Sequence, residues 1–127
     1  MKTLTVSNGL VLHDEIKRIA KILQELKISF YSQSDTLEVI SVVINENPEV
    51  LIFDDDLFGE KSSDLLKNIR KIKSDLKIIF ITSDTGVEKG REVIDAGIYL
   101  YLIKPLEVNV LNEALTSILD KKSEAYY

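Results

Sequence analysis

The sequence predicts an α/β fold in which a parallel β-sheet is covered by helices on both faces. Short apolar or β-branched segments alternate five times with longer segments that have helical periodicity. In addition, residues 78–81 are apolar at every position, as expected for a parallel strand that is buried on both faces. Alternation of this kind places successive strands in one sheet, with each connecting helix packed against a face.

Five strands are predicted, each a short run rich in β-branched or apolar residues. They cover residues 3–6, 28–31, 50–53, 77–82 and 99–103. Right-handed crossovers leave few topologies for five strand–helix units, and the chain length favours a doubly wound sheet with the flavodoxin-like strand order 2-1-3-4-5. In such sheets the functional crevice lies beyond the carboxyl ends of the strands, where the order reverses between strands 1 and 3.

The segments between and after the strands each place apolar residues on one helical face. The first two faces consist of Ile16, Ile19, Ala20, Leu23 and Leu26, and of Leu37, Ile40, Val43 and Ile44. The third and fifth consist of Leu65, Leu66, Ile69 and Ile72, and of Val108, Leu111, Leu115 and Ile118. Ser62, Ser63 or Asp64 could cap the third helix. The fourth helix, residues 87–96, is short and is expected to stop at Gly97.

The composition suits one folded domain. The chain has 127 residues, of which 45% are hydrophobic and 29% charged; we expect residues 1–120 to form the domain and residues 121–127 a C-terminal tail or the start of a linker. A net charge of −5 argues against direct binding of nucleic acid. No run approaches the ~20 apolar residues of a membrane span and no secretory signal is recognised, so a cytoplasmic protein without a membrane segment is expected.

Polar residues follow three of the predicted strands at the same edge of the sheet. Asp54 ends the third strand, Thr82 the fourth, and Lys104 follows the fifth. A carboxylate can act as the nucleophile in phosphoryl transfer, while an ammonium and a hydroxyl can hold the transferred oxygens. Each residue alone carries little information, but their joint placement predicts a phosphoryl-transfer site in which Asp54, Thr82 and Lys104 converge.

These segments resemble the receiver domain of bacterial two-component response regulators. Residues 48–54 resemble the segment that leads into the phospho-acceptor, residues 81–83 the hydroxyl motif of the fourth strand, and residues 96–105 the fifth-strand segment with its Lys-Pro pair. The resemblance covers nearly the whole chain, including the intervals between motifs. It implies that Asp54 accepts a phosphoryl group from a sensor histidine kinase, that Thr82 and Lys104 contact that group, and that rotation of the Tyr101 ring is coupled to Thr82.

The resemblance fails at the end of the first strand, where receivers carry two acidic residues that hold Mg²⁺. Ser7 and Asn8 occupy these positions and offer only neutral oxygens, whereas Mg²⁺ prefers carboxylates. We therefore expect weak Mg²⁺ binding by Asp54 and, as a partial compensation, Asp56, and we expect phosphorylation to be weakened. Asp55 is expected to point elsewhere.

A different register for the first strand would change this conclusion. If residues 9–13 formed the strand, Asp14 and Glu15 would become the acidic pair. The opening Met-Lys-apolar segment favours the strand at residues 3–6. Phe58 stands where receivers usually have a turn proline, so the loop after Asp54 is expected to be less rigid.

Two function classes fit the residues. The first is a signalling module that is not an enzyme, binds a sensor histidine kinase or another signalling protein, and could form a homodimer through the face made by the fourth helix, fifth strand and fifth helix. The second is a haloacid dehalogenase-like phosphatase, because residues 51–56 also resemble the first motif of that family, with Asp54 as nucleophile and Asp56 as general acid. After Lys104 no acidic residues are placed to form the metal-binding pair which that family needs.

Overall fold

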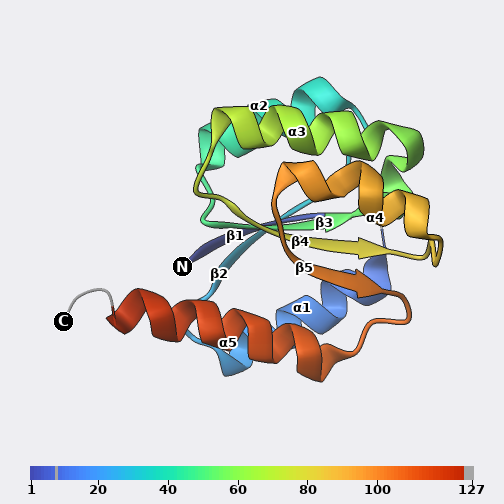
Figure 1. Ribbon diagram of the computed structural model, residues 1–127. Helices are drawn as coiled ribbons and strands as arrows, with labels where there is room; N and C mark the ends of the chain where they lie inside the picture. The colour runs from blue at the N-terminus through green and yellow to red at the C-terminus, as the bar shows by residue number, and fades with distance from the viewer. Residues whose placement is uncertain (8, 125–127) are drawn as a thin grey trace.

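The computed structural model contains a five-stranded parallel sheet in the order β2-β1-β3-β4-β5, which confirms the predicted doubly wound fold (Figure 1). The structure describes residues 1–7 and 9–124. The strands are β1 (Lys2–Val6), β2 (Lys27–Tyr31), β3 (Val50–Asp54), β4 (Lys77–Thr82) and β5 (Ile98–Ile103). All of the neighbouring strand pairs are parallel, so the carboxyl ends of β1, β3, β4 and β5 meet at one edge.

The helices form a layer on each face of this sheet. Helices α2, α3 and α4 cover one face, and α1 and α5 cover the other (Figure 1). Their bounds are α1 (Leu10–Ile22), α2 (Thr36–Glu46), α3 (Ser62–Ile72), α4 (Val87–Val93) and α5 (Val108–Glu124). Three short 3-10 turns, η1 (Asp55–Leu57), η2 (Gly59–Lys61) and η3 (Ile94–Ala96), connect β3 to α3 and α4 to β5.

Successive strand residues belong to different halves of the core. Alternate residues of β3 and β4 pack with α2, α3 and α4, and the residues between them pack with α1 and α5. The central strands are therefore apolar on both faces, as the sequence predicts. The first half contains Leu51, Phe53, Ile78 and Phe80, and the second contains Val50, Ile52, Ile79 and Ile81.

The structure decides between the two registers proposed for the first strand. β1 spans Lys2–Val6, whereas residues 10–13 are helical, so the alternative strand at residues 9–13 is wrong. Asp14 and Glu15 lie inside α1 and do not follow a strand. The residue after β1 is Ser7, which is fully buried.

Several details of the predicted helices are wrong. Helix α1 ends at Ile22, so Leu23 and Leu26 lie beyond it, and Ile72 of α3 is 49% exposed. In α2 the buried residues are Val39 and Val43, whereas Leu37 and Ile44 are 73% and 56% exposed. Because α2 carries apolar residues around most of its circumference, periodicity alone does not identify its buried face. None of the predicted caps precedes α3: Ser62 is its first residue, and the helix continues directly from η2 without a side-chain cap.

Gly97 ends the α4–η3 segment as predicted, with a left-handed φ of 75°. The side chain of Arg70, from α3, fixes this turn by donating hydrogen bonds to the carbonyls of Ala96 (2.7 Å) and Gly97 (2.9 Å). A Cβ at residue 97 would lie 3.4 Å from the Arg70 guanidinium. At that distance a Cβ would make an ordinary van der Waals contact, so the turn depends on glycine for its left-handed conformation.

A row of aromatic rings crosses the half of the core that faces α3 and α4. Phe58 stacks on Phe53 at 4.9 Å between ring centroids, Phe53 lies 6.0 Å from Phe80, and Phe80 lies 5.1 Å from Tyr101. Phe58 is only 7% exposed. The residue that replaces the turn proline thus anchors its loop in the core. The lower rigidity expected for this loop stays a prediction.

The carboxyl-terminal helix is longer than the sequence suggests. α5 continues to Glu124, so part of the segment expected to be a tail is helical, and residues 125–127 lie outside the described residues. Within the part of the chain that the structure describes, we find no helix with the length and apolar character needed to cross a bilayer.

Candidate functional site

Asp54 lies at the carboxyl end of β3 and is only 2% exposed. The Ser7 hydroxyl donates a 2.8 Å hydrogen bond to its Oδ2. Lys104 Nζ lies 3.0 Å from Oδ1 and 3.1 Å from Oδ2 of the same carboxylate. The backbone N–H of Asp56 donates to Oδ1 at 3.1 Å. The Asp54 carboxylate is therefore nearly buried, yet it is bound by one cation and two neutral donors.

Asp56 shares the Lys104 ammonium with Asp54. Lys104 Nζ lies 2.9 Å from Asp56 Oδ2, while the backbone N–H and hydroxyl of Ser83 bond to Asp56 Oδ1 at 3.2 and 2.7 Å. Partial burial raises the pKa of Asp56, but hydrogen bonds from Lys104 and Ser83 outweigh it and the pKa is lowered. Burial likewise lowers the pKa of Lys104, but its bonds to Asp56 and Asp54 outweigh burial and the pKa is raised.

Thr82 ends β4 at the same edge of the sheet as Asp54, as predicted, but its hydroxyl bonds neither Asp54 nor Lys104. The Thr82 hydroxyl donates instead to Asp55 Oδ2 at 2.7 Å and accepts from the backbone N–H of Asp84 at 3.0 Å. The reason is the alternation of side chains along a strand. Asp54 belongs to the strand face covered by α1 and α5, whereas Thr82 and Asp55 lie on the face covered by α2, α3 and α4.

Asp55 points away from Asp54, as expected, but it is part of a second polar cluster that the sequence analysis missed. Its carboxylate is 3% exposed and its Oδ1 lies 3.1 Å from Lys89 Nζ of α4. This contact is an ion pair without the geometry of a directed hydrogen bond. Lys89 also donates to the Gly59 carbonyl at 3.0 Å. In the sequence Lys89 is one of several charged residues in a short helix, and nothing there marks it as buried.

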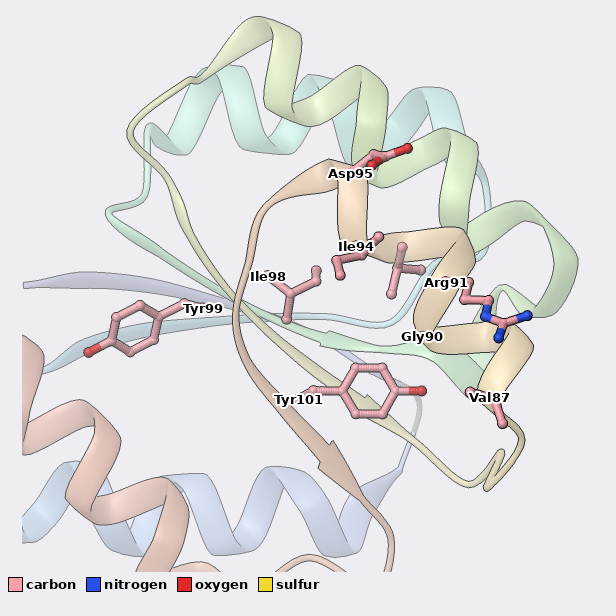
Figure 2. Close-up of a pocket in the computed structure, with 9 residues that line it drawn as sticks. Val87, Gly90, Arg91, Ile94, Asp95, Ile98, Tyr99 and Tyr101 are labelled. Atoms are coloured by element: carbon pink, nitrogen blue, oxygen red, sulfur yellow. The ribbon is translucent and has the colours of Figure 1, made fainter.

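Tyr101 lies on β5 with its ring stacked on Phe80, and it lines a groove between β5 and α4. Figure 2 shows the ring extending from β5 beneath the helix. Burial raises the pKa of Tyr101, and the carboxylates of Asp55 and Asp84 raise it further. The groove has a volume of about 690 Å³ and is also lined by Val87, Gly90, Arg91, Val93, Ile94, Asp95, Ile98 and Tyr99.

The residues around Asp54 do not fit the usual Mg²⁺ site of two or three carboxylates. The Lys104 ammonium already bridges the carboxylates of Asp54 and Asp56, and Ser7 contributes a neutral hydroxyl. Among residues 1–7 and 9–124, no group of three or more acidic, histidine or cysteine side chains is arranged to hold a metal. Asn8, the other position of the degenerate acidic pair, lies outside the described residues.

A small hollow gives access to Asp54 from the side of the sheet that carries α1. Its volume is about 280 Å³ and its lining is mostly apolar. The lining residues are Gly9, Leu12, Glu15, Asp54, Lys104, Pro105 and Leu106. A reactive group presented on a side chain of another protein could approach the carboxylate through this opening.

Comparison with known proteins identifies the family. Residues 13–116 match the sequence model of the response regulator receiver domain. The chain belongs to the response regulator receiver family. Receiver domains are typically signalling modules rather than enzymes, they interact with histidine kinases and other signalling proteins, and they generally bind Mg²⁺. These findings give no support to the haloacid dehalogenase-like alternative.

Two curated relatives illustrate how similar this chain is to other proteins. It is 32% identical over 109 residues to the nitrate/nitrite response regulator protein homolog of Haemophilus influenzae, a match that covers 84% of this chain and 52% of the relative. The chain thus spans about half the length of that relative. It is 20% identical over 93 residues to sporulation initiation phosphotransferase F of Bacillus subtilis, which covers 73% of this chain and 75% of that protein.

Solved structures share the fold. A CheY-like receiver domain protein from Methanospirillum hungatei superposes with a TM-score of 0.81 at 22% identity, covering 98% of this chain and 97% of the other. The isolated receiver domain of RcsB from Salmonella enterica gives a TM-score of 0.79 at 20% identity, covering 94% and 88% of the two chains. At these identities the likeness establishes the architecture and leaves the site to be argued from its own residues.

Proposed function

We propose that Asp54 is the phospho-acceptor of this receiver domain and that Lys104 stabilises the phosphorylated carboxylate. The observation that carries the proposal is the position of Lys104 Nζ, within 3.1 Å of both Asp54 oxygens at the carboxyl edge of the sheet. An Asp54 oxygen would form a bond to phosphorus as the P–N bond of a donor phosphohistidine breaks, and the imidazole would leave with the electron pair of that bond. The ammonium would offset the charge that collects on the phosphoryl oxygens.

We further propose that this transfer is slow because the metal-binding half of the site is degenerate. Ser7 supplies a hydroxyl where a carboxylate would attract Mg²⁺, and the bridging ammonium of Lys104 competes with a cation between Asp54 and Asp56. Asp54 and Asp56 would bind Mg²⁺ weakly. A receiver domain with these residues could also act by binding a partner protein without being phosphorylated.

Thr82 and Tyr101 keep their proposed switch roles, but Thr82 has to change partner to perform its role. Its hydroxyl proton is now donated to Asp55, so contact with a phosphoryl group on Asp54 requires that bond to break. Coupling between Thr82 and the Tyr101 ring remains a prediction. Because the Tyr101 ring lines the groove beside α4, rotation of the ring would change the shape of that groove.

We also propose a phosphoryl donor, domain bounds, an oligomeric state and a cellular location, on the basis of the family and the composition. The phosphoryl donor would be a sensor histidine kinase. The domain would comprise residues 1–120, and residues 121–127, of which 121–124 continue α5, would form a C-terminal extension or the start of a linker. A homodimer could form through the face made by α4, β5 and α5. We also propose a cytoplasmic location and no direct contact with nucleic acid or membrane, in line with the net charge of −5.

Acyl-phosphate labelling tests the acceptor. The protein is incubated with a small acyl phosphate and Mg²⁺, and the adduct is measured by intact mass. Little adduct is expected for the wild-type chain, more for the Ser7→Asp variant, and none when Asp54→Asn is added to Ser7→Asp. Asp95→Asn in the same background is the control because Asp95 is an exposed aspartate in η3. An adduct that survives Asp54→Asn would show that another group is the acceptor.

A further inference from the structure

Thr82, Asp55 and Lys89 form a buried polar cluster on the opposite face of the sheet from Asp54. Thr82 is fully buried, and Asp55 and Lys89 are only 3% and 9% exposed. The Thr82 hydroxyl donates to Asp55 Oδ2 at 2.7 Å, and Lys89 Nζ lies 3.1 Å from Asp55 Oδ1. The cluster connects the end of β4, the first residue after β3 and helix α4.

The hydrogen bond from Thr82 to Asp55 excludes the bond expected in a phosphorylated domain. A hydroxyl group carries one hydrogen and can donate it to one acceptor at a time. Asp54 and Asp55 are successive residues that point to opposite faces of the sheet. The Thr82 hydroxyl therefore cannot donate to the Asp55 carboxylate and to a phosphoryl oxygen on Asp54 at the same time. The two carboxylates are therefore alternative destinations for the same proton donor.

We propose that Asp55 and Lys89 are positioning residues which hold the Thr82 hydroxyl away from Asp54 and so favour the resting form of the domain. The inference rests on the proposed role of Asp54 as the acceptor. Asp55 competes for the hydroxyl as an anion, and hydrogen bonds to ionised acceptors are about twice as strong as neutral ones. Conversion to the phosphorylated form then includes the loss of this bond.

Lys89 is needed because a carboxylate this deeply buried requires a compensating charge. Its ammonium is fixed in turn by the Gly59 carbonyl at 3.0 Å, so the loop after β3 and the first half of α4 are held together. Helix α4 also forms one wall of the groove beside Tyr101 (Figure 2). The ion pair that keeps Asp55 bonded to Thr82 is thus also a contact between the loop after β3 and helix α4.

The test removes both charges together, because either single substitution would leave a buried unpaired charge. The main variant is Asp55→Val with Lys89→Met. A second variant, Asp55→Asn with Lys89→Met, keeps a neutral acceptor for Thr82. The matched control is Lys2→Met with Glu46→Leu, which removes an exposed ion pair of 3.0 Å at the other end of the sheet. All three proteins keep the net charge of the wild type.

Thr82 is observed directly by NMR of threonine-methyl-labelled protein, first without any phosphoryl mimic. We expect one side-chain rotamer in the wild type and the control, and a second, populated rotamer in the Val/Met variant. Beryllium fluoride with Mg²⁺ is then titrated as a mimic of the phosphoryl group on Asp54. Its apparent affinity should rise about tenfold or more in the Val/Met variant, since one charged hydrogen bond no longer opposes it. The Asn/Met variant should lie between.

An unchanged Thr82 rotamer in the Val/Met variant would overturn the inference, whatever the affinity does. A changed rotamer with an affinity within about twofold of the wild type would also overturn it, because the hold would then not oppose the phosphorylated form. The titration is repeated with Ser7→Asp added to each protein, because Ser7 weakens Mg²⁺ binding. If beryllium fluoride shifts no Asp54 resonance even in that background while the Thr82 rotamer changes, the acceptor role of Asp54 fails and the hold of Asp55 on Thr82 is supported.

Discussion

The Ser7 hydroxyl donates a hydrogen bond to Asp54 Oδ2 across the β1–β3 pair, at 2.8 Å and in a position without solvent exposure. The bond is made possible by the register of the two strands, in which Val6 lies opposite Phe53. It satisfies one lone pair of a buried carboxylate without adding charge. In a receiver domain this replaces an attraction for Mg²⁺ with a bond that needs no metal.

Ser7→Asp should therefore make stability depend on Mg²⁺. Without a divalent cation, a second buried carboxylate next to Asp54 costs about 2–4 kcal/mol of unfolding free energy, from repulsion and the lost hydrogen bond. Mg²⁺ at a hundred times its Kd should return about 2.7 kcal/mol. Thermal unfolding in chelator and in Mg²⁺ measures both effects. Ser7→Asn is the neutral control and should show no added response. An equal Mg²⁺ response in the wild type would mean that its site binds the metal well.

Lys104→Met should destabilise the domain because it leaves Asp54 buried without a cation. Loss of one partner from a fully buried pair costs about 3–5 kcal/mol. Since the Lys104 side chain is 32% exposed, we expect a smaller cost of about 1–3 kcal/mol, measured by urea unfolding at neutral pH. Lys2→Met removes a lysine from an exposed ion pair and should change stability by less than about 1 kcal/mol. Equal effects of the two substitutions would contradict the burial argument.

The Asp56–Lys104 contact should contribute stability only within a defined pH range. The pKa of Asp56 is lowered from its ordinary value of 3.8, so its contribution is present above that value and is lost as pH falls through the folded-state pKa. The pKa of Lys104 is raised from 10.5, so its contribution is present below that value and is lost as pH rises through the folded-state pKa. Urea unfolding of the wild type and Asp56→Asn across pH should show a stability difference that disappears in acid. A difference that grew in acid would contradict this sign.

Gly97→Ala and Gly90→Ala should change stability in opposite directions. At Gly97 the backbone has a left-handed φ of 75°, so alanine should cost about 1–2 kcal/mol. At Gly90 a Cβ meets nothing within 4 Å and the residue is helical, so alanine should add up to about 1 kcal/mol. Thermal unfolding of both variants provides the comparison. A stabilised Gly97→Ala protein would show that the left-handed turn relaxes without cost.

The sequence predicts the sheet order because each strand is short, apolar and followed by a helical segment. It also predicts that Asp54 and Lys104 meet, since both follow strands whose ends lie at one edge. The partner of the Thr82 hydroxyl was not predicted, although the strand register indicates it. In the strand register Asp54 lies opposite Ile81, so Thr82 is opposite the next residue, Asp55, and shares its face.

Other features depend on packing that local patterns do not contain. Lys89 is buried because α4 brings it against Asp55, which comes much earlier in the chain. Similarly, α2 buries Val39 and Val43 rather than Leu37 and Ile44 because the sheet meets only one side of a helix that is apolar on several. In both cases tertiary contacts select among residues that the sequence presents as equivalent.

The row of rings from Phe58 to Tyr101 joins the loop beyond the candidate acceptor to the groove beside α4. The rings are closely packed, so a smaller side chain at one end would leave a gap. The neighbouring rings could fill that gap only by shifting along the row. A change in the size of residue 58 would therefore be felt at β5, the edge strand that carries Tyr101. The shape of the groove beside α4 thus depends in part on a side chain in the loop after β3.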